Sequence, residues 1–418
     1  MNQKRVIVVG AGVAGLFSAY YLKQAGFDVT VIDKGNGTDN CSYGNAGMIV
    51  PSHIIPLSSP GVISKGLRWM LDAESPFYIR PRLSLDLISW LWKFKQASTK
   101  AHVEESGPIL RDLLLSSRQL LLNLESDENF EFSFEKKGLF MFCNTEKGLD
   151  KEREIADKAN SLGIPAETLS SEEVGEMEKD LSLDIVGATY YPKDAHLHPG
   201  SLMNGLKDLL MQRDVHFKYN TVATSLRTEN GRVKEVKTGN GENLEADYVV
   251  LCPGAWSGEF LGRMGHRMPM QAGKGYSITL QNPPVLPGYC GILAEKKVTL
   301  TPINNTLRFA GTMEIVGTDT QISPKKISGL KKSVLEYLPQ FSPEDLEGHK
   351  VWTGLRPCSP DGLPYVGRID TYENLFTSTG HAMMGMSLAP SCGKIVADLI
   401  AEETSDLYDQ RINPNRYT

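Results

Sequence analysis

Three closely spaced glycines near the N-terminus have the spacing that most directly suggests a chemistry. Gly10, Gly12 and Gly15 form a Gly-x-Gly-x-x-Gly pattern, and Asp33 follows 18 residues after Gly15. Glycines at this spacing allow a tight turn and let a pyrophosphate approach the bare backbone, while an acid at this distance can accept hydrogen bonds from a ribose. The pattern therefore predicts a binding site for a dinucleotide.

The elements expected around these glycines form a βαβ unit. Residues 5–9 are an apolar, β-branched run typical of a parallel strand that is buried on both faces. A helical stretch follows as far as Ala25, and a second strand is expected over 29–32, ending at Asp33. The first helical turn would offer unpaired N–H groups and a positive dipole to the phosphates. Because the strand, the glycines, the helix, the second strand and the acid follow one another at the expected spacing, they favour a dinucleotide site over a plain glycine-rich turn.

The rest of the chain favours FAD over NAD as this dinucleotide. In a nicotinamide dehydrogenase further strand–helix units should follow promptly, but here a glycine-rich polar loop over 41–47 leads into a proline-studded region. A second nucleotide-type element is expected only near the C-terminus, with a strand over 374–379, a turn at 380–381 and a helix over 386–401. One ligand that contacts both ends of the sequence fits FAD better.

Composition and charge exclude several functional classes. The 418 residues are 41% hydrophobic and 22% charged, as in ordinary globular proteins, and their net charge is −6. No basic field is available to bind the phosphates of nucleic acid. The N-terminal apolar run is too short and glycine-rich for a signal peptide, and no stretch of about 18 apolar residues predicts a spanning helix. We expect a soluble cytoplasmic protein, at most peripheral to the inner face of the membrane.

The cysteines and histidines do not predict a metal site. The six cysteines are scattered and include no Cys-x-x-Cys pair, which favours buried thiols in a reducing compartment. His196 and His198 would share a face in a strand and could then bind a metal. They stand just before a helix expected over 201–212, so a loop or helix-entry role is favoured and no metal is expected.

The middle of the chain is expected to form a domain that the chain enters, leaves and re-enters. Residues 60–125 look helical, whereas 130–142 and 269–316 alternate like antiparallel strands. Residues 85–94 are strongly amphipathic and flanked by lysines and arginines. They could dock on a membrane surface, although a core helix with a solvated rim is the favoured interpretation.

Further motifs appear in a fixed order along the chain: Ser42-Tyr-Gly-Asn45-Ala-Gly47, Lys274-Gly-Tyr276-Ser-Ile, Ala310-Gly-Thr-Met-Glu314-Ile-Val-Gly317, Gly354-Leu-Arg356-Pro and Gly380-His381. With the glycine pattern and Asp33, they make the chain resemble the FAD-dependent D-amino acid dehydrogenases of the D-amino acid oxidase/glycine oxidase superfamily, from about residue 4 to about residue 403. The resemblance implies an α/β protein (α+β overall), with a Rossmann-like FAD-binding domain interleaved with a substrate domain that contains a large, mostly antiparallel sheet. The implied FAD-binding domain comprises 1–50, 195–262 and 352–418, and the substrate domain 51–194 and 263–351.

The resemblance also implies which residues bind FAD. The loop over 42–47 would run beside the isoalloxazine ring, and the C-terminal helix would direct its N-terminal dipole at the flavin and stabilise its reduced form. The backbone of Val222 would contact the adenine. The expected contacts are Gly10, Gly12, Val13, Ala14, Gly15, Asp33, Lys34, Ser42, Asn45, Ala46, Gly47, Val222, Gly254, Gly380, Met384, Gly385 and Met386. Cys358 suggests a covalent flavin, but the cysteine that some sarcosine oxidases use would fall near Gly354, so non-covalent FAD is expected.

For the substrate, the resemblance implies that Arg356 binds the carboxylate through a bidentate fork. The alternative is a structural pairing of Arg356 with a neighbouring acid such as Asp361. Tyr276 is expected to close the site, although a plain strand tyrosine fits nearly as well. His53 and His381 could titrate near the substrate amine, or could be hydrogen-bonded histidines behind the site.

The implied reaction is the oxidation of a D-amino acid by hydride transfer from Cα to flavin N5, after which the imine is hydrolysed to a 2-oxo acid and ammonia. Ala382-Met383-Met384 stand where similar glycine oxidases have a second arginine, which favours a larger or cyclic side chain such as that of D-proline or D-hydroxyproline. Two alternatives stay open: a glycine/sarcosine-type amine oxidase that uses oxygen, and a non-catalytic flavin-binding regulator. Neither the electron acceptor (quinone, carrier or oxygen) nor the oligomeric state is predicted.

Overall fold

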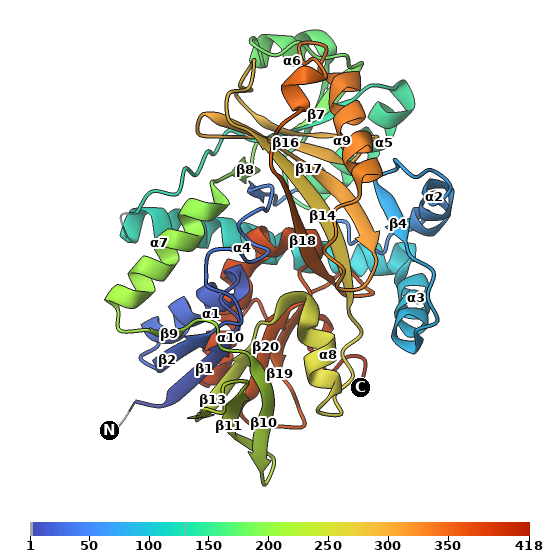
Figure 1. Ribbon diagram of the computed structural model, residues 1–418. Coiled ribbons are helices and arrows are strands. Elements are labelled where there is room, and N and C mark those ends of the chain that lie inside the picture. Colours follow the sequence, from blue (N-terminus) through green and yellow to red (C-terminus); the bar gives the residue numbers. More distant parts are fainter. Residues whose placement is uncertain (1–2, 129) are drawn as a thin grey trace.

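A six-stranded sheet occupies the lower half of the computed structural model, which describes residues 3–128 and 130–418 (Figure 1). Its strands lie in the order β19-β20-β13-β1-β2-β9. Their bounds are β1 Arg5–Val9, β2 Asp28–Ile32, β9 His216–Lys218, β13 Tyr248–Leu251, β19 Tyr365–Arg368 and β20 Leu375–Thr379. All pairs are parallel except β19 with β20. Because β1 lies beside β13, and β13 beside β20, the two ends of the sequence meet in one sheet, as expected from the sequence.

A nine-stranded sheet forms the upper half (Figure 1), in the order β18-β14-β17-β16-β15-β5-β7-β6 with β4 paired to β17. Its strands are β4 Phe77–Ile79, β5 Leu139–Cys143, β6 Glu167–Ser170, β7 Gly187–Tyr191, β14 Gln271–Leu280, β15 Cys290–Leu293, β16 Val298–Ile303, β17 Thr306–Ile315 and β18 Val351–Cys358. Only β4 with β17 and β15 with β5 pair in parallel. The predicted large, mostly antiparallel sheet is confirmed.

Two small sheets complete the strands. One joins β3 (Met48–Ile49) to β8 (Ala195–His196), and the other contains β10 (Ala223–Glu229), β11 (Arg232–Thr238) and β12 (Asn243–Glu245). His196 therefore lies in a short strand rather than in a loop. His198 has the predicted helix-entry role, because its Nδ1 accepts a hydrogen bond from the Ser201 N–H at the start of α7. In the described part of the chain, no group of three or more His, Cys, Asp or Glu side chains could hold a metal ion.

Ten α-helices surround these sheets in the part of the chain that the structure describes: α1 Val13–Gln24, α2 Val62–Trp69, α3 Leu85–Ala97, α4 Lys100–Asp127, α5 Glu146–Ser161, α6 Ser171–Met177, α7 Pro199–Gln212, α8 Ser257–Gly262, α9 Pro324–Tyr337 and α10 Gly385–Ile400. Helices α1 and α10 pack against each other and contact the six-stranded sheet. Among residues 3–128 and 130–418, no helix has both the length and the apolar composition needed to cross a bilayer.

Two elements lie in a different half of the protein from the domain to which the sequence assigns them. Strand β18 pairs with β14 along its length, so residues 352–358 belong to the nine-stranded sheet rather than to the nucleotide half. Helix α4 packs on α10 and shares the core of α1, so it lies with the nucleotide half rather than with residues 51–194. The apolar pattern of α4 predicts that one face is buried but not which element covers it. The other boundaries stay a prediction.

Candidate active site

The glycine turn after β1 has room for a ligand on one side only. Gly10 has a φ of +110°, and a Cβ there would lie 2.5 Å from the carbonyl oxygen of Cys252. A Cβ on Gly15 would lie 1.8 Å from the Gly10 oxygen. Gly12 differs, because a Cβ there would have only Ser42 Oγ nearby, at 3.6 Å. The turn therefore packs tightly against the protein at Gly10 and Gly15 and is open at Gly12, as a cradle for a pyrophosphate requires.

The loop after β2 folds back over this turn. Asp33 accepts hydrogen bonds from the N–H of Ala11 at 2.6 Å and from the N–H of Gly35 at 2.7 Å. Ser42 Oγ accepts from the N–H of Val13 at 3.0 Å, so it caps the first turn of α1. The other N–H groups of that first turn cannot be paired within the helix itself and are suited to an anion. The geometry of the glycine turn thus fits the dinucleotide part of FAD.

The remaining residues expected at the adenosine end lie around the same turn. The N–H of Thr221 donates to the Asp33 carbonyl at 2.8 Å, which brings the neighbouring Val222 close to Asp33. The Lys34 ammonium lies 3.1 Å from the ring centre of Trp256, and burial lowers the pKa of this lysine. Gly254 follows β13, and its carbonyl oxygen accepts a hydrogen bond from Thr379 Oγ1 at 3.2 Å. Gly254 therefore lies beside the end of β20, which belongs to the C-terminal part of the sequence.

The loop over 42–47 is held from above by the nine-stranded sheet. Arg308 of β17 donates to the carbonyl oxygens of Asn45 at 2.6 Å and Tyr43 at 3.2 Å. Ser277 Oγ of β14 donates to the Gly44 carbonyl at 3.2 Å, and a Cβ on Gly44 would lie 1.9 Å from the ring of Trp352. Burial lowers the pKa of Arg308 to about 10, so it stays protonated at neutral pH. Two strands and this arginine therefore fix the loop that is expected to lie beside the flavin.

Arg308 is not among the residues expected from the sequence. What the sequence does show is that Arg308 is a single arginine in an otherwise apolar strand segment, Thr306-Leu-Arg-Phe-Ala310. An arginine at such a position is expected to carry a specific partner, because burying its charge without one is costly. The sequence does not show that this partner is a pair of backbone carbonyls more than 260 residues away.

Arg356 lies on the same face of the nine-stranded sheet as Trp352 and Ser277. Directly paired residues of neighbouring strands share a face, and the register pairs Arg356 with Gly273 and Trp352 with Ser277. The guanidinium covers Gly275, where a Cβ would lie 2.2 Å from Nη1, and Nη1 donates to the Thr312 carbonyl at 2.6 Å. Burial lowers the pKa of Arg356. Arg356 thus faces the side of the sheet that holds the flavin loop.

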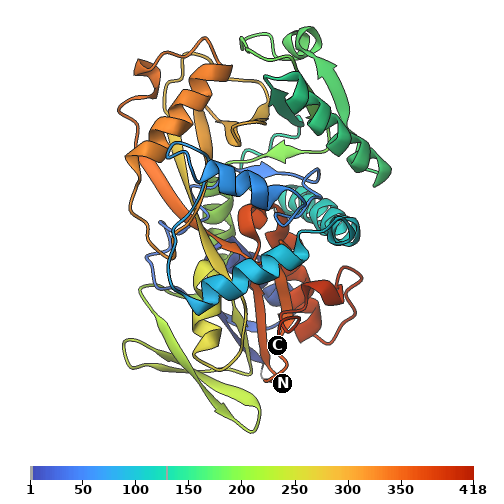
Figure 2. The same cartoon turned by 90° about the vertical axis from the view of Figure 1, so that its right-hand side faces the viewer.

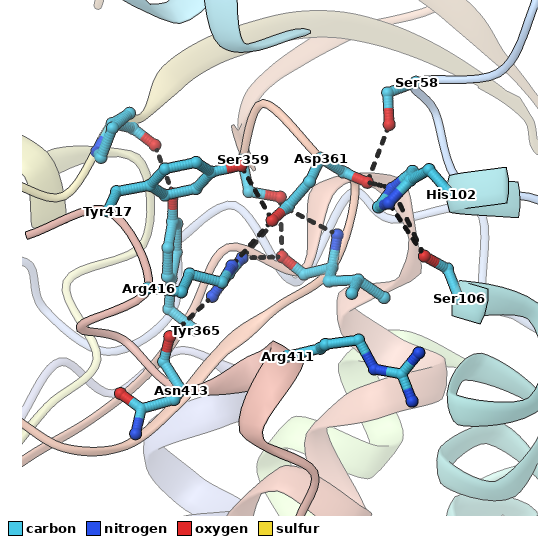
Figure 3. Close-up of polar contacts among 12 residues, drawn as sticks. Ser58, His102, Ser106, Ser359, Asp361, Tyr365, Arg411, Asn413, Arg416 and Tyr417 are labelled. Carbon is cyan, nitrogen blue, oxygen red and sulfur yellow. Dashed lines mark hydrogen bonds and ion pairs between the residues drawn. The ribbon is translucent and has the colours of Figure 1, made fainter. Parts of the chain in front are cut away.

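No carboxylate in residues 3–128 and 130–418 lies within ion-pair distance of Arg356. The alternative partner, Asp361, is bound instead by Arg416, through contacts of 2.7 Å from Nε and 3.0 Å from Nη2 (Figure 3). Asp361 also accepts from the Tyr417 hydroxyl at 3.0 Å and from the Leu363 N–H at 3.1 Å. The alternative in which Arg356 pairs with Asp361 is therefore wrong, and the guanidinium stays available for an anionic ligand.

Tyr276 lies on the opposite face of the sheet, together with Lys274. Its hydroxyl donates to Glu314 and accepts from the N–H of Ser323 at 3.3 Å, while Lys274 lies 3.5 Å from the same carboxylate. Burial raises the pKa of Tyr276. Contrary to the expectation from the sequence, Tyr276 does not reach the face that carries Arg356. This cluster instead fixes the segment that precedes α9 to the sheet.

The two histidines expected near the amine lie in segments that meet at α10. Residues His381 and Cys358 form a β-bridge, which brings His381 close to the end of β18, and His381 Nε2 is buried without a hydrogen-bond partner in the described chain. His53 follows β3, which is joined to the first turn of α10 because Ser387 Oγ donates to the Met48 carbonyl at 3.0 Å. Burial lowers the pKa of each histidine to about 4, so both are neutral at neutral pH.

The last expected contacts lie at the start of α10. Gly380 has a φ of +77°, and a Cβ there would lie 2.7 Å from the ring of Tyr365, so only glycine fits this turn. Residues 382–384 form a single 3-10 turn, and α10 begins at Gly385 with Met386 buried. The C-terminal turn, the strand β3 and the loop over 42–47 therefore converge below the face that carries Arg356, as a flavin ring between them requires.

Comparisons with known proteins agree with this geometry. The sequence profile of the family described as FAD dependent oxidoreductase (DAO) matches residues 5–399. The chain is 32% identical over 420 residues to the D-amino acid dehydrogenase of Neisseria meningitidis serogroup C, and 31% identical over 420 residues to that of Methylobacterium nodulans, with 99% of each chain covered in both cases. The crystal structure of glycine oxidase from Geobacillus kaustophilus has a similar fold, with a TM-score of 0.78, 22% identity and 100% of both chains covered.

Proposed function

Because the chain belongs to the family of FAD-dependent oxidoreductases, we propose that it oxidises D-amino acids, including cyclic ones such as D-proline. FAD is its cofactor, and the resemblance to this superfamily is confirmed. The chain is therefore an enzyme rather than a non-catalytic flavin-binding regulator. When bound, FAD supplies an acceptor for two electrons. The remaining chemistry concerns how the side chains of this protein hold the substrate.

One observation carries the proposal: a half-buried guanidinium, that of Arg356, has no carboxylate partner in the described residues and lies on the sheet face that holds the flavin loop. Nη1 already binds the Thr312 carbonyl, which fixes the plane of the fork while its other N–H groups remain available. A substrate carboxylate bound there would have one orientation, and orientation of this kind lowers a reaction barrier by several kcal/mol.

The residues beside this arginine support a substrate with an apolar side chain. Ala382, Met383 and Met384 form the turn before α10, and His381 next to them is neutral. Methionine side chains are flexible and polarisable and adapt to ligands of different shape. No second arginine follows His381 to bind a small polar substrate. This favours D-proline, D-hydroxyproline and other larger D-amino acids over glycine.

An anaerobic substrate panel tests the proposed activity. The purified holoenzyme is mixed without oxygen with D-alanine, D-proline, D-hydroxyproline, their L-enantiomers, glycine and sarcosine, and flavin absorbance is followed. We expect D-amino acids to bleach the flavin, since only a true substrate transfers electrons. Bleaching by sarcosine or glycine but by no D-amino acid would instead establish the alternative, a glycine/sarcosine-type amine oxidase. Reoxidation by oxygen compared with a quinone identifies the acceptor.

We also propose that α2 and α3 contact an anionic membrane surface. Both helices lie at the right of Figure 1 and at the front of Figure 2. Helix α3 buries Leu87, Trp90 and Phe94, which confirms that one face belongs to the core. The exposed large apolar side chains of this region are Ile63, Leu67, Leu71, Leu83, Leu85, Ile88 and Trp92. Helices α2 and α3 also contain four basic residues and only one acid, Asp86, a balance that suits anionic lipid.

Vesicle flotation tests this membrane contact. We expect the protein to float with anionic phosphatidylserine vesicles and to stay in the bottom fraction with neutral phosphatidylcholine vesicles. Both the burial of apolar side chains and the attraction between opposite charges contribute to membrane binding. Leu85→Glu, at a side chain that is 85% exposed, should abolish flotation without unfolding the protein. Met211→Glu on α7, also at an exposed apolar side chain, is the matched control and should float normally. Wild-type protein that remains below with both vesicles would contradict the proposal.

A further inference from the structure

A buried chain of hydrogen bonds connects the interior of the protein to His53. Ser52 Oγ donates to Asp194 Oδ2 at 2.5 Å, the Ser52 N–H donates to Asp194 Oδ1 at 3.0 Å, and Ser52 Oγ lies 3.1 Å from His53 Nδ1. Asp194 has no exposed surface and Ser52 is 5% exposed. This arrangement follows from the pairing of β3 with β8, because Ser52 comes shortly after β3 and Asp194 directly before β8.

The geometry sets the direction of each hydrogen bond. A serine hydroxyl has one hydrogen, and here it is given to the carboxylate. Ser52 Oγ can then only accept from His53, so Nδ1 of His53 bears the ring proton and Nε2 has a free lone pair. Nε2 has no hydrogen-bond partner in the described chain, and the His53 side chain is partly accessible. His53 thus offers a proton acceptor whose other nitrogen is connected to a buried acid.

The segment that contains His53 lies between the two halves of the protein, where the substrate is proposed to bind. The segment that contains it is joined to the first turn of α10 through Ser387, whose Oγ accepts from the Val50 N–H at 3.2 Å. On its other side, the apolar residues Val50 and Ile54 pack with β5 and β15 of the nine-stranded sheet. His53 is therefore between the nucleotide half and the substrate sheet.

We propose that His53, Ser52 and Asp194 form a proton relay that deprotonates the substrate ammonium, an inference that rests on the proposed amino acid oxidation. The N–H bond of the ammonium breaks and its proton binds His53 Nε2. The Nδ1 proton passes to Ser52 Oγ, and the hydroxyl proton passes to Asp194 Oδ2. The substrate is left as a neutral amine and Asp194 as a neutral acid, so one proton has moved and no electrons have been exchanged. His53 contacts the substrate, while Ser52 and Asp194 are positioning residues that act through it.

The charges and the burial around the relay favour proton transfer from His53 to Asp194. Burial raises the pKa of Asp194 to about 7, against the opposing effects of Ser52 and of the cation Arg118 on α4. Burial, with the positive charge of Lys297 in the turn between β15 and β16, lowers the pKa of His53 to about 4. A proton that enters at His53 is therefore more stable on Asp194. At neutral pH Asp194 is close to its midpoint and can both accept and release a proton.

Anaerobic stopped-flow kinetics with D-alanine or D-proline test the relay. In wild type we expect the rate of flavin reduction to rise with pH around 7, the pKa of Asp194. Ser52→Ala should lower the rate at pH 7 by about 100-fold, the scale of general base catalysis, and shift the rise to higher pH. Ser52→Thr keeps the hydroxyl and should restore the rate. Ser58→Ala, at another buried serine of the same segment, is the control and should leave rate and profile unchanged.

A second measurement does not depend on turnover. Because the pKa of Asp194 rises from 3.8 in the unfolded chain to about 7 in the folded one, the stability of wild type relative to Asp194→Asn should be greatest below pH 3.8 and should fall as the pH rises through 7. Infrared spectra of wild type should show a carboxyl group that titrates near pH 7 and is absent from Asp194→Asn.

The outcomes separate the relay from the proposed function. If no D-amino acid bleaches the flavin, the proposed oxidation fails, whatever the carboxyl titration shows. If D-amino acids bleach it but Ser52→Ala keeps the wild-type pH profile, the relay is overturned and the oxidation stands. If the serine variant does not fold, the absence of a carboxyl that titrates near pH 7 in wild type overturns the relay by itself.

Discussion

Replacing Arg356 with alanine is expected to raise the KM for a D-amino acid sharply and to lower kcat/KM by about 3 kcal/mol, roughly 150-fold. The loss follows from the setting of this guanidinium, which is half-buried, fixed by the Thr312 carbonyl and without a carboxylate partner in the described chain. A substrate carboxylate would lose its charged partner in the variant and would have to be buried unpaired. Steady-state kinetics with the best substrate of the panel, under saturating acceptor, measure the effect.

Two controls make this result specific for substrate binding. Arg356→Lys keeps the positive charge but not the planar fork, so an intermediate KM is expected if two parallel hydrogen bonds matter. The FAD content and thermal stability of Arg356→Ala should stay close to wild type, because in the described residues the Arg356 side chain has one hydrogen-bond partner, the main-chain carbonyl of Thr312. An unchanged KM would remove Arg356 from the substrate site.

Replacing Gly12 with alanine is expected to abolish tight FAD binding without unfolding the protein. Gly12 has φ −73° and ψ 174°, which any residue can adopt, and the added Cβ would have only Ser42 Oγ nearby, at 3.6 Å. The protein itself therefore tolerates the methyl group. A pyrophosphate on the bare backbone does not, and the overlap should cost about 1–3 kcal/mol, which raises the Kd of FAD roughly 5- to 150-fold. Titration of the deflavinated protein with FAD measures this.

The contrast with other glycines identifies where the ligand lies. Gly15→Ala should prevent folding of the turn, because its Cβ would lie 1.8 Å from the Gly10 oxygen. Gly175→Ala in α6, an exposed glycine with no atom near its Cβ, should raise stability slightly, because alanine favours the helix, and should leave FAD affinity unchanged. Normal FAD binding by Gly12→Ala would mean that the dinucleotide does not cross this turn.

The nucleotide half could be predicted from the sequence because its signals are local. Gly10, Gly12 and Gly15 set a turn between adjacent elements, and β2 ends one residue before Asp33, as expected. The strand expected over 130–142 was only partly correct, since β5 begins at Leu139. Phe132 and Phe134 pack in the core with residues of α1 and α4. The backbone of their segment forms only an isolated bridge, between Glu135 and His196 of β8, and is not part of β5.

The substrate site was harder to predict because it depends on distant partners. Alternation along β14 separates Tyr276 from Ser277, but it does not say which face of the sheet carries the flavin loop. The proximity of Asp361 to Arg356 in sequence suggested a pair, yet Arg416, 55 residues further on, binds that acid. Ser52 and Asp194, 142 residues apart, are joined only through the pairing of β3 with β8.

The contacts of Arg308 bear on how enzymes of this fold can be re-engineered. Arg308 binds the loop over 42–47 through the backbone oxygens of residues 43 and 45, and Ser277 binds the backbone oxygen of residue 44. Main-chain acceptors are the same for almost any amino acid, so side chains in this loop can be exchanged without losing its anchorage. The exceptions are Gly44, where the indole of Trp352 leaves no room, and Gly47, which has a φ of +79° and where a Cβ would lie 2.3 Å from the Leu197 carbonyl oxygen. Libraries that vary positions 43, 45 and 46 while keeping both glycines are therefore a practical route to new flavin environments in the same scaffold.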